Sequence, residues 1–473
     1  MHRLLALIAL ISIGAFAQTR DLVLTHINIV DVQGNRILAD QDVVIDTASA
    51  KIKSIGKSHS KATKDAIDLR GQYLIPGLWD MHTHMAGLNA DPKWSASLLK
   101  VLVAHGIVGI RDMGGSLTAL RDWQQQIRDG RLIGPDIVTS GPMLDAEFKD
   151  SDVLNFTTPD EARKVVDTVA ERGADFVKIL SNATPAEYSA IADESKKRGM
   201  TFVGHVPPLV SASTASDSGQ SSIEHFVYGG ISIECSSRAA ELREEMQQAM
   251  KGGRILDIAA VLEKAEATFD PQRAAALWRK MKTNHTAFTP TLISTYTNGH
   301  LAELGREDSD LRFLPAEFQK AWAVVPTSSA AVTKMDWHKK ELEVEKALVK
   351  KMHDAAVLLL AGSDSLDPHD IPGSSLHHEL RLLNQSGLTP AETLRTATSN
   401  AATFLKRPND GTIAVGHTAN LVVLQGNPLD DIAATARISA VILRGKYIDR
   451  SGLDHLRSSA EADAKAYTPP PQK

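Results

Sequence analysis

The segment from Leu78 to Ala361 alternates short apolar runs with longer amphipathic stretches, and this alternation restricts the fold most strongly. A short run rich in aliphatic and β-branched residues is typical of a buried strand, and a longer amphipathic stretch is typical of a helix. Strands that alternate with helices favour a parallel sheet with crossover helices. We expect eight strands, at Leu78–Met81, Ile107–Arg111, Ile137–Ser140, Phe176–Leu180, Thr201–Gly204, Ser222–His225, Ala287–Thr291 and Val357–Ala361. The sequence therefore predicts an α/β protein with a (β/α)8 TIM-type barrel over residues 76–405.

Helix signals lie between and after these runs. Thr158 precedes a predicted helix at Pro159–Arg172, and a second helix is predicted at Pro185–Arg198. After the last strand we expect a helix at Leu376–Gln385 and another that begins after Thr389 and runs to about Leu405. The residues at about 229–285 and 292–351 are predicted to be helical insertions. Each insertion could form a lid, a wall of the substrate site or a dimer surface, and the sequence does not decide among these three roles.

Both ends of the chain carry short strand patterns with glycine turns. Residues 18–75 contain several such runs, and residues 406–457 repeat the same style. The simplest arrangement is one small β-sandwich domain built from both ends beside the barrel. The tail 458–473, which ends in three prolines, is expected to be disordered.

The first 17 residues are typical of a secretory signal peptide. Arg3 supplies a positive charge, an apolar run follows, and Ala15-Phe16-Ala17 forms a small-x-small cleavage site. The alternative is a membrane anchor, but the run is short for a spanning helix. We therefore expect a secreted or periplasmic protein.

Composition narrows the classes of partner. The formal net charge of -5 gives no reason to expect nucleic acid or an acidic membrane surface. Cys235 is the only cysteine, so neither an internal disulfide nor a cysteine-based zinc site can form. We expect a small-molecule or dipeptide substrate, and the sequence leaves a homo-oligomer open.

Metal-competent side chains fall at the ends of the predicted strands. His82 and His84 lie two residues apart, so in a strand both would point to one face. In such a barrel the carboxyl ends of the strands carry the active site. A single strand-end histidine is about as often a packed residue as a ligand, whereas a lysine inside an apolar strand is costly without a partner. The six candidates are His82, His84, Lys178, His205, His225 and Asp364.

These six residues resemble, position by position, the metal site of the amidohydrolase superfamily. The resemblance extends to the lead-in Leu74–Leu78, the segment Gly109–Gly115 and the closing run Ala419–Leu424. It is strongest to the imidazolonepropionase-like branch, which includes binuclear Xaa-Pro dipeptidases. Asn420 departs from the family, which usually has Asp at this structural position.

The resemblance implies two divalent metal ions, zinc above all, with a CO2-derived carbamate on Lys178 bridging them. His82, His84 and Asp364 would hold the buried ion, and His205 and His225 the exposed one. Asp364 would also carry the proton from the attacking water to the leaving nitrogen. Tyr228 could donate a hydrogen bond to the developing oxyanion, or it could be a rim aromatic that packs under the inserted helices.

The expected activity is hydrolysis of an amide C–N bond, with an Xaa-Pro or other dipeptide as the substrate class. Prolidase-like relatives carry a histidine-rich stretch after the third strand, whereas Ser140–Glu147 contains no histidine. Cyclic amides, lactones or carbamates therefore stay open as substrates. A catalytically dead barrel that only binds ligands is the remaining alternative. Arg111 could pair with a substrate carboxylate or with a neighbouring acid.

Overall fold

A computed structural model describes residues 21–58, 65–87, 90–304, 309–324 and 327–468. The expected signal peptide, residues 1–17, and the last five residues lie outside the described part. Among the described helices, none combines the length and apolar character that a bilayer crossing requires.

Parallel strands form the centre of the molecule, which confirms the predicted α/β class. One three-stranded sheet contains β6 (Leu78–Thr83), β7 (Ile107–Asp112) and β8 (Asp136–Thr139). A second has the order β10-β9-β11-β12-β13-β14, with β9 at Met143–Asp145, β10 at Val153–Asn155, β11 at Phe176–Ile179, β12 at Thr201–Gly204, β13 at Ser222–Glu224 and β14 at Ala287–Thr289. Seven of the eight predicted strands are present, and the short strands β9 and β10 were not predicted.

The eighth predicted strand, Val357–Ala361, is not a regular strand, and the prediction is wrong here. The segment still lies between β14 and β6, because Leu360 donates a backbone hydrogen bond to Phe288 and Ala361 accepts one from Met81. Leu359 forms a single parallel bridge to Phe288. Isolated pairing with β6 continues beyond this segment, since Asp364 donates a backbone hydrogen bond to His82 and Ser365 forms a parallel bridge to Thr83.

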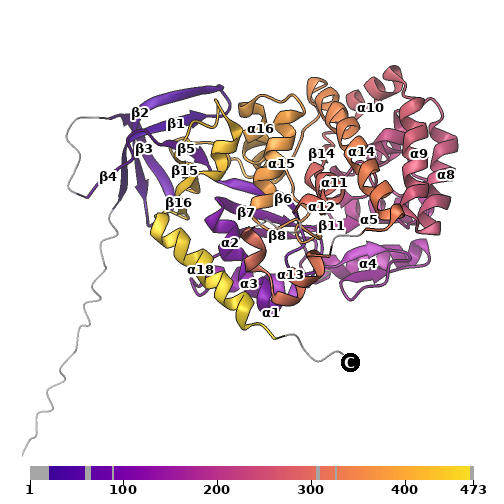
Figure 1. Cartoon of the computed structure of the whole chain (residues 1–473), viewed down its shortest axis with the longest axis horizontal. Helices are drawn as coiled ribbons and strands as arrows, with labels where there is room; N and C mark the ends of the chain where they lie inside the picture. The colour runs from indigo at the N-terminus through magenta and orange to yellow at the C-terminus, as the bar shows by residue number, and fades with distance from the viewer. Residues whose placement is uncertain (1–20, 59–64, 88–89, 305–308, 325–326, 469–473) are drawn as a thin grey trace, which may run out of the picture.

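Helices surround the parallel strands (Figure 1). They include α1 (Pro92–Ser95), α2 (Leu98–Ala104), α3 (Leu117–Arg128), α4 (Pro159–Glu171), α5 (Pro185–Lys197), α6 (Ala212–Asp217), α15 (Ser374–Gln385), α16 (Pro390–Thr396) and α17 (Ser399–Phe404). The predicted N-cap of α4 is confirmed, since the Thr158 hydroxyl accepts from the Glu161 amide. The single helix predicted from Thr389 to Leu405 is two helices, and the carbonyl of Ala397 between them accepts a hydrogen bond from Trp79 of β6.

Both predicted insertions are helical. The first contains α7 (Ile231–Glu234), α8 (Ala239–Gly252), α9 (Ile255–Ala267) and α10 (Pro271–Thr283). The second contains α11 (Leu292–Gly299), α12 (Leu301–Leu304), the 3-10 helix η1 (Ser309–Phe313), α13 (Ala316–Trp322) and α14 (Ser329–Asp354). Figure 1 shows α8, α9, α10 and α14 together at the end of the molecule opposite the terminal sheet.

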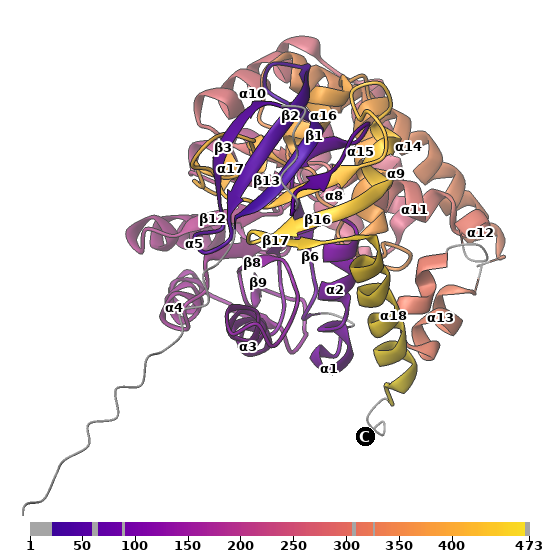
Figure 2. The same cartoon turned by 90° about the vertical axis from the view of Figure 1, so that its left-hand side faces the viewer.

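Strands from both ends of the chain build one mixed sheet, as predicted (Figure 2). Its order is β17-β16-β15-β5-β1-β2-β3, with β4 beside β1; the bounds are β1 Leu22–Asp31, β2 Arg36–Asp46, β3 Lys51–Lys57, β4 Ile67–Asp68, β5 Tyr73–Pro76, β15 Leu421–Leu424, β16 Ile438–Leu443 and β17 Lys446–Ile448. β15 pairs antiparallel with β5, with Val422 opposite Ile75. A separate apolar core joins Leu24 and Val43 to Leu421 and Ala440. The expected sandwich is thus one continuous sheet with its own core, rather than two separate sheets.

The predicted disordered tail from residue 458 is wrong for its first part. Helix α18 spans Arg450–Ala466, after the short 3-10 helix η2 (Ile432–Ala436). Asp449 caps α18 by accepting from the Gly452 amide. Its buried residues, Leu453, Leu456, Ala460 and Ala464, recur at helical spacing, and the helix packs against α2.

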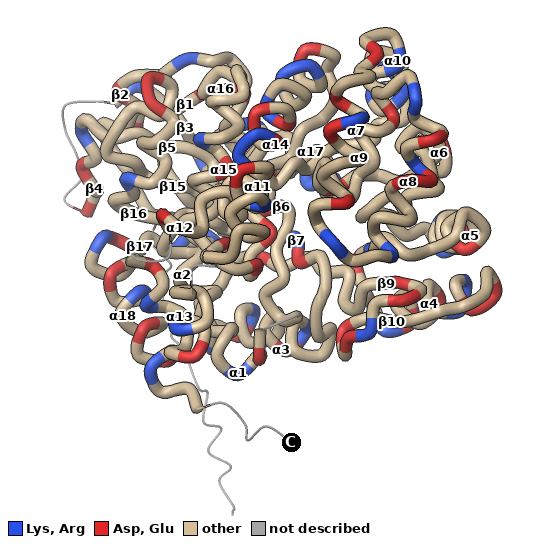
Figure 3. Tube along the Cα trace, turned by 45° about the vertical axis from the view of Figure 1, so that its right-hand side comes forward, with Lys and Arg blue, Asp and Glu red and all other residues tan. Residues whose placement is uncertain are grey.

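Charged residues of both signs are interspersed along the surface helices (Figure 3). On α18, for example, Arg450 pairs with Asp454, and Lys465 pairs with Glu461. Exposed pairs of this kind contribute little to stability, so the apolar core must supply most of it.

Candidate metal centre

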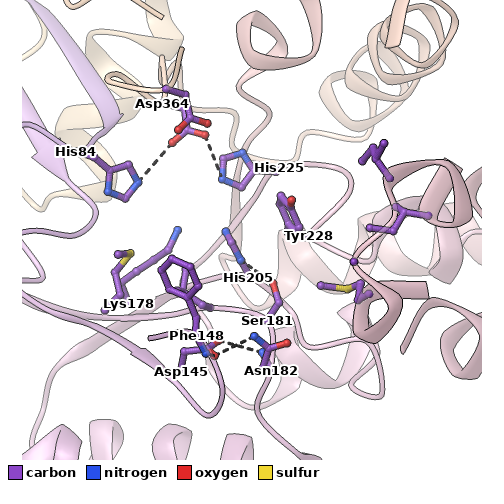
Figure 4. A pocket seen from close by; sticks show the side chains of 17 residues that line it. His84, Asp145, Phe148, Lys178, Ser181, Asn182, His205, His225, Tyr228 and Asp364 are labelled. Atoms are coloured by element: carbon purple, nitrogen blue, oxygen red, sulfur yellow. Dashed lines mark hydrogen bonds and ion pairs between the residues drawn. The ribbon is translucent and has the colours of Figure 1, made fainter. Parts of the chain in front are cut away.

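The six side chains singled out by the sequence converge at the carboxyl ends of the parallel strands. His82 lies on β6 and Lys178 on β11, whereas His205 and His225 directly follow β12 and β13. A cavity of about 520 Å³ opens here; it is lined by His84, Lys178, His205, His225, Tyr228 and Asp364, among others (Figure 4). His82 is fully buried beneath it and contacts Asp364.

Asp364 lies at the centre of the cluster. Its carboxylate oxygens lie 3.3 Å from Nε2 of His82, 3.5 Å from Nε2 of His84 and 3.8 Å from Nε2 of His225. The ligand atoms of His82, His225 and Asp364 all lie within 4.8 Å of one another. Imidazole nitrogens grouped around a carboxylate are a suitable ligand set for zinc and related metals.

Each of the four histidines is held from outside by its Nδ1 atom. Hydrogen bonds at Nδ1 orient a ring and leave Nε2 available, which is the usual arrangement behind metal-binding histidines. The partners are the Glu224 carboxylate for His82 (3.1 Å), the Gly114 carbonyl for His84 (3.1 Å), the Ser181 hydroxyl for His205 (2.8 Å) and the Thr291 hydroxyl for His225 (2.6 Å). Figure 4 shows His84 and His225 directed at Asp364, and His205 beside Ser181.

Two buried polar atoms in the cluster have no hydrogen-bond partner among the described residues. They are Nζ of Lys178 and Nε2 of His82. The Lys178 side chain is only 1% exposed, and burial lowers its pKa to about 8. An unpartnered buried amine is costly, so these residues fit a centre in which a bound metal completes the contacts.

The backbone at the cluster is strained. His225 and Asp364 both have left-handed φ angles, 61° and 57°, which residues other than glycine rarely adopt. Gly362 allows the Asp364 loop to approach β6, because a Cβ atom there would lie 2.7 Å from Cβ of His82. Strain of this kind persists where the surrounding structure fixes a functional geometry.

Two buried acids that the sequence analysis did not select hold the cluster in place. Glu224 binds His82 and also pairs with Arg111, whose Nη2 lies 2.9 Å and 3.0 Å from its oxygens. Arg111 is therefore a structural ion-pair residue, the second of its two predicted roles. Asp80 accepts hydrogen bonds from the amides of Ser363 and His82, which ties β6 to the Asp364 loop. An acid inside an apolar strand was the available sequence signal for both.

Comparison with known proteins gives the family. The profile of the Amidohydrolase family matches residues 73–448, which is most of the chain. The chain belongs to the amidohydrolase family. Among curated proteins it is similar to ochratoxinase from Aspergillus niger, with 21% identity over 78% of this chain and 73% of the relative.

Solved structures of low sequence identity share the amidohydrolase fold. Bottromycin amidohydrolase superposes with a TM-score of 0.70 at 19% identity, covering 94% of this chain and 90% of that one. A Xaa-Pro dipeptidase with bound methionine in its active site superposes with a TM-score of 0.65 at 20% identity, covering 91% and 100%. The family assignment makes this chain a metal-dependent hydrolase that acts on amides.

The first helical insertion forms one wall of the amidohydrolase's cavity. Met250, Gly253, Ile255 and Ile258, from the α8–α9 region, line it. Of the roles left open for this insertion, the wall is therefore the one that its position supports.

Tyr228 lies on the rim beside the cluster. Its ring stacks on His205 with centroids 4.8 Å apart and an interplanar angle of 13°. The side chain is 38% exposed and lines the cavity, and burial of the remainder raises the pKa of its phenol. The hydroxyl group is therefore protonated at neutral pH and can donate a hydrogen bond into the cavity.

Proposed function

We propose that this amidohydrolase is an exported enzyme that holds two divalent metal ions, zinc above all, and cleaves an amide C–N bond of a small substrate. The observation that carries the proposal is the set of four histidines, each held at Nδ1, around Asp364 and the buried, unpartnered Lys178. Export rests on the sequence pattern of residues 1–17 alone.

The proposed ligands divide into two groups. His82, His84 and Asp364 would hold the buried ion, and His205 with His225 the exposed one. Lys178 would bridge the two as a carbamate, since an ammonium cannot act as a ligand whereas a carbamate offers two oxygens. The lowered pKa of the buried Lys178 amine favours the neutral form that reacts with CO2.

In the proposed reaction, Asp364 carries a proton from the attacking water to the leaving nitrogen. When bound, the metal ions would supply a Lewis acid and make a water molecule acidic near neutral pH. Burial alone would raise the pKa of Asp364, but His82 and His225 hold it below its ordinary range, so the carboxylate is ionised and can accept a proton. Asp364 would then pass this proton to the leaving nitrogen. Tyr228 would donate a hydrogen bond from its phenol to the carbonyl oxygen as negative charge develops there.

For the substrate, the leading proposal is a dipeptide-type amide, including Xaa-Pro. The fold similarity to a Xaa-Pro dipeptidase supports this choice. A second candidate, cleavage of cyclic amides, lactones or carbamates, is favoured by the stretch after β8. Met143 and Asp145 from that stretch line the cavity, where prolidase-like relatives are expected to have histidines.

We further propose that the two parallel sheets close into one (β/α)8 barrel over residues 76–405. Hydrogen bonds from Val357–Ala361 to β14 on one side and to β6 on the other support closure at that point.

Metal analysis of the purified protein tests the proposed function. We expect close to two divalent ions per chain, loss of amide hydrolysis after chelation, and recovery with zinc and bicarbonate. Lys178→Ala should abolish hydrolysis and lower the metal content, whereas Lys197→Ala, which changes an exposed lysine of α5 paired with Glu194, should do neither. Full hydrolysis by a metal-free preparation would refute the proposal.

A further inference from the structure

The substrate cavity continues past the metal centre into a second space. The first space, of about 520 Å³, and the second, of about 170 Å³, share the lining residues His225, Tyr228, Ile255, Asp364 and Asp367. We call the first the apolar lobe and the second the polar lobe. A bond that is cleaved at the shared residues therefore places the two halves of its substrate in different lobes.

The apolar lobe offers a hydrophobic wall to one half of the substrate, and polar residues such as Asp145, Ser181 and Asn182 line it as well. Its wall includes Met143, Phe148, Leu180, Met250 and Ile258. Lys178 is the only lysine or arginine among its described lining residues, and this lysine belongs to the proposed metal centre. The apolar lobe therefore offers no separate cation that could pair with a substrate carboxylate.

The polar lobe does contain such a cation. Lys334, on α14, is the only lysine or arginine among the described residues that line it, and it is half-buried. Lys334 forms no ion pair or hydrogen bond with any residue that the structure describes. A lysine that faces a cavity without a partner is available to bind an anionic group of a ligand.

His338 supports the same interpretation. It follows Lys334 by one helical turn, so both side chains lie on one face of α14, and both line the polar lobe. His338 is 8% exposed, and both of its ring nitrogens lack a partner among the described residues. Burial lowers its pKa to about 4, so the ring is neutral and carries one N–H donor. An unsatisfied buried donor costs free energy until a ligand accepts its hydrogen bond.

Three acids line the polar lobe with these two groups: Asp364, which belongs to the proposed metal centre, Asp367 near it, and Glu345 on α14. Glu345, a further two turns along α14, lines the polar lobe and is 1% exposed. Burial raises its pKa to about 8, so this carboxyl group is largely protonated at neutral pH.

We propose that the substrates are amides with one apolar half and one half that carries a carboxylate, as in N-acyl amino acids, and that Lys334 binds this carboxylate in the polar lobe. His338 donates a second hydrogen bond to the same group. The proposal rests on the proposed amide hydrolysis, since it places the two halves of the substrate on either side of the metal centre. Lys334 is then a specificity residue: it contacts the substrate but takes no part in the chemical step.

A matched pair of ligands separates recognition from turnover. Benzenesulfonyl-L-phenylalanine and its carboxamide resemble the substrate class but carry a sulfonamide that the enzyme does not hydrolyse. Calorimetric titration into the zinc-loaded full chain measures their binding. N-benzoyl-L-phenylalanine and its carboxamide, followed by release of benzoate, measure turnover in the same preparations. The variants are Lys334→Met, Lys334→Arg and, as a control, Lys340→Met, which changes an exposed lysine on α14 that does not line either lobe.

We expect the wild type to bind the free acid about 10-fold or more tightly than the carboxamide, as for a charge-assisted hydrogen bond. Lys334→Met should remove this preference and raise KM for benzoylphenylalanine with little change in kcat. Lys334→Arg should keep most of the preference, and Lys340→Met all of it. Equal binding of acid and carboxamide by the wild type, a preference that survives in Lys334→Met, or no binding of either ligand would overturn the proposal. A Lys334-dependent preference without benzoate release would instead refute the proposed hydrolysis and leave the carboxylate site standing.

Discussion

Nδ1 of His82 lies 3.1 Å from a carboxylate oxygen of Glu224, the residue that directly precedes His225. The same carboxylate pairs with the buried Arg111. One acid on β13 thus orients a histidine from β6, and it is itself held by an arginine from β7. The candidate metal cluster depends on this chain of contacts, whose three members are all buried.

Glu224→Gln should therefore weaken both the fold and the metal site. Removing the charge leaves the Arg111 guanidinium without its buried partner, which costs about 3 kcal/mol of unfolding free energy. The loss of the carboxylate behind His82 should lower metal affinity about 10-fold or more. Urea unfolding and metal analysis at limiting zinc measure the two effects. Glu194→Gln, which alters a buried glutamate paired with Lys197 on α5, should leave zinc affinity unchanged; an equal loss in both variants would contradict the prediction.

Tyr228→Phe should lower kcat with the metals retained. If the phenol donates a hydrogen bond to the oxyanion, its removal costs about 100-fold in kcat. Stacking on His205 needs only the ring, so the phenylalanine should preserve the packing. Tyr296→Phe, on α11 and outside the lining of both lobes, serves as the control. Unchanged kcat in Tyr228→Phe would assign this side chain to packing alone.

Glu341→Gln should stabilise the protein at alkaline pH. Burial and the neighbouring Glu345 raise the pKa of Glu341 to about 10. An acid whose pKa is raised by folding binds more protons in the folded state, so its contribution to stability falls as pH rises from about 4.5 towards 10. At pH 8 the unfolding free energy of the variant, measured with urea, should be about 2 kcal/mol higher than that of the wild type. At pH 5 the difference should be smaller. Glu343→Gln, at an exposed position on the same helix, should show no such pH dependence.

Gly362→Ala should disturb the metal cluster through sterics alone. The added Cβ would lie 2.7 Å from Cβ of His82 and 2.9 Å from its backbone nitrogen. Overpacking of this kind costs about 1–3 kcal/mol and should displace the Asp364 loop, so metal affinity should fall as well. At Gly252, by contrast, the nearest atom lies 3.8 Å away, and alanine there should be tolerated. If Gly362→Ala bound zinc as tightly as the wild type, the Asp364 loop would have accommodated the added methyl group, and the prediction would be wrong.

The sequence predicted the cluster because its residues belong to regular local patterns. His82 and His84 share a strand face by simple alternation, and Lys178 stands out as a charge in an apolar strand. Asp80 and Glu224 carried the same signals, since Asp80 shares the face of His82 and Glu224 precedes His225. These two acids were missed because their positions in the sequence do not show whether an acid binds a metal or holds the side chains that do.

The remaining differences arise from tertiary contacts. Lys334 is an ordinary lysine in a polar stretch, and only the way in which the second insertion folds back brings it to the cavity. The eighth strand was predicted from an apolar run, but strand geometry also needs ladder partners on each side, and Val357–Ala361 has only isolated ones. Helix α18 could have been predicted from the spacing of Leu453, Leu456 and Ala460, which the polar residues around them obscured.

The position of β15 in the terminal sheet determines when, during synthesis, this sheet can be completed. β15 lies between β5 and β16, so the edge of β5 has no neighbour on that side until residues 421–424 have been synthesised. During translation, the edge of β5 therefore stays unpaired until nearly the whole chain has been synthesised. An open edge of this kind is a site where other chains can pair, so early termination before Leu421 should yield a product prone to aggregation rather than a smaller working enzyme.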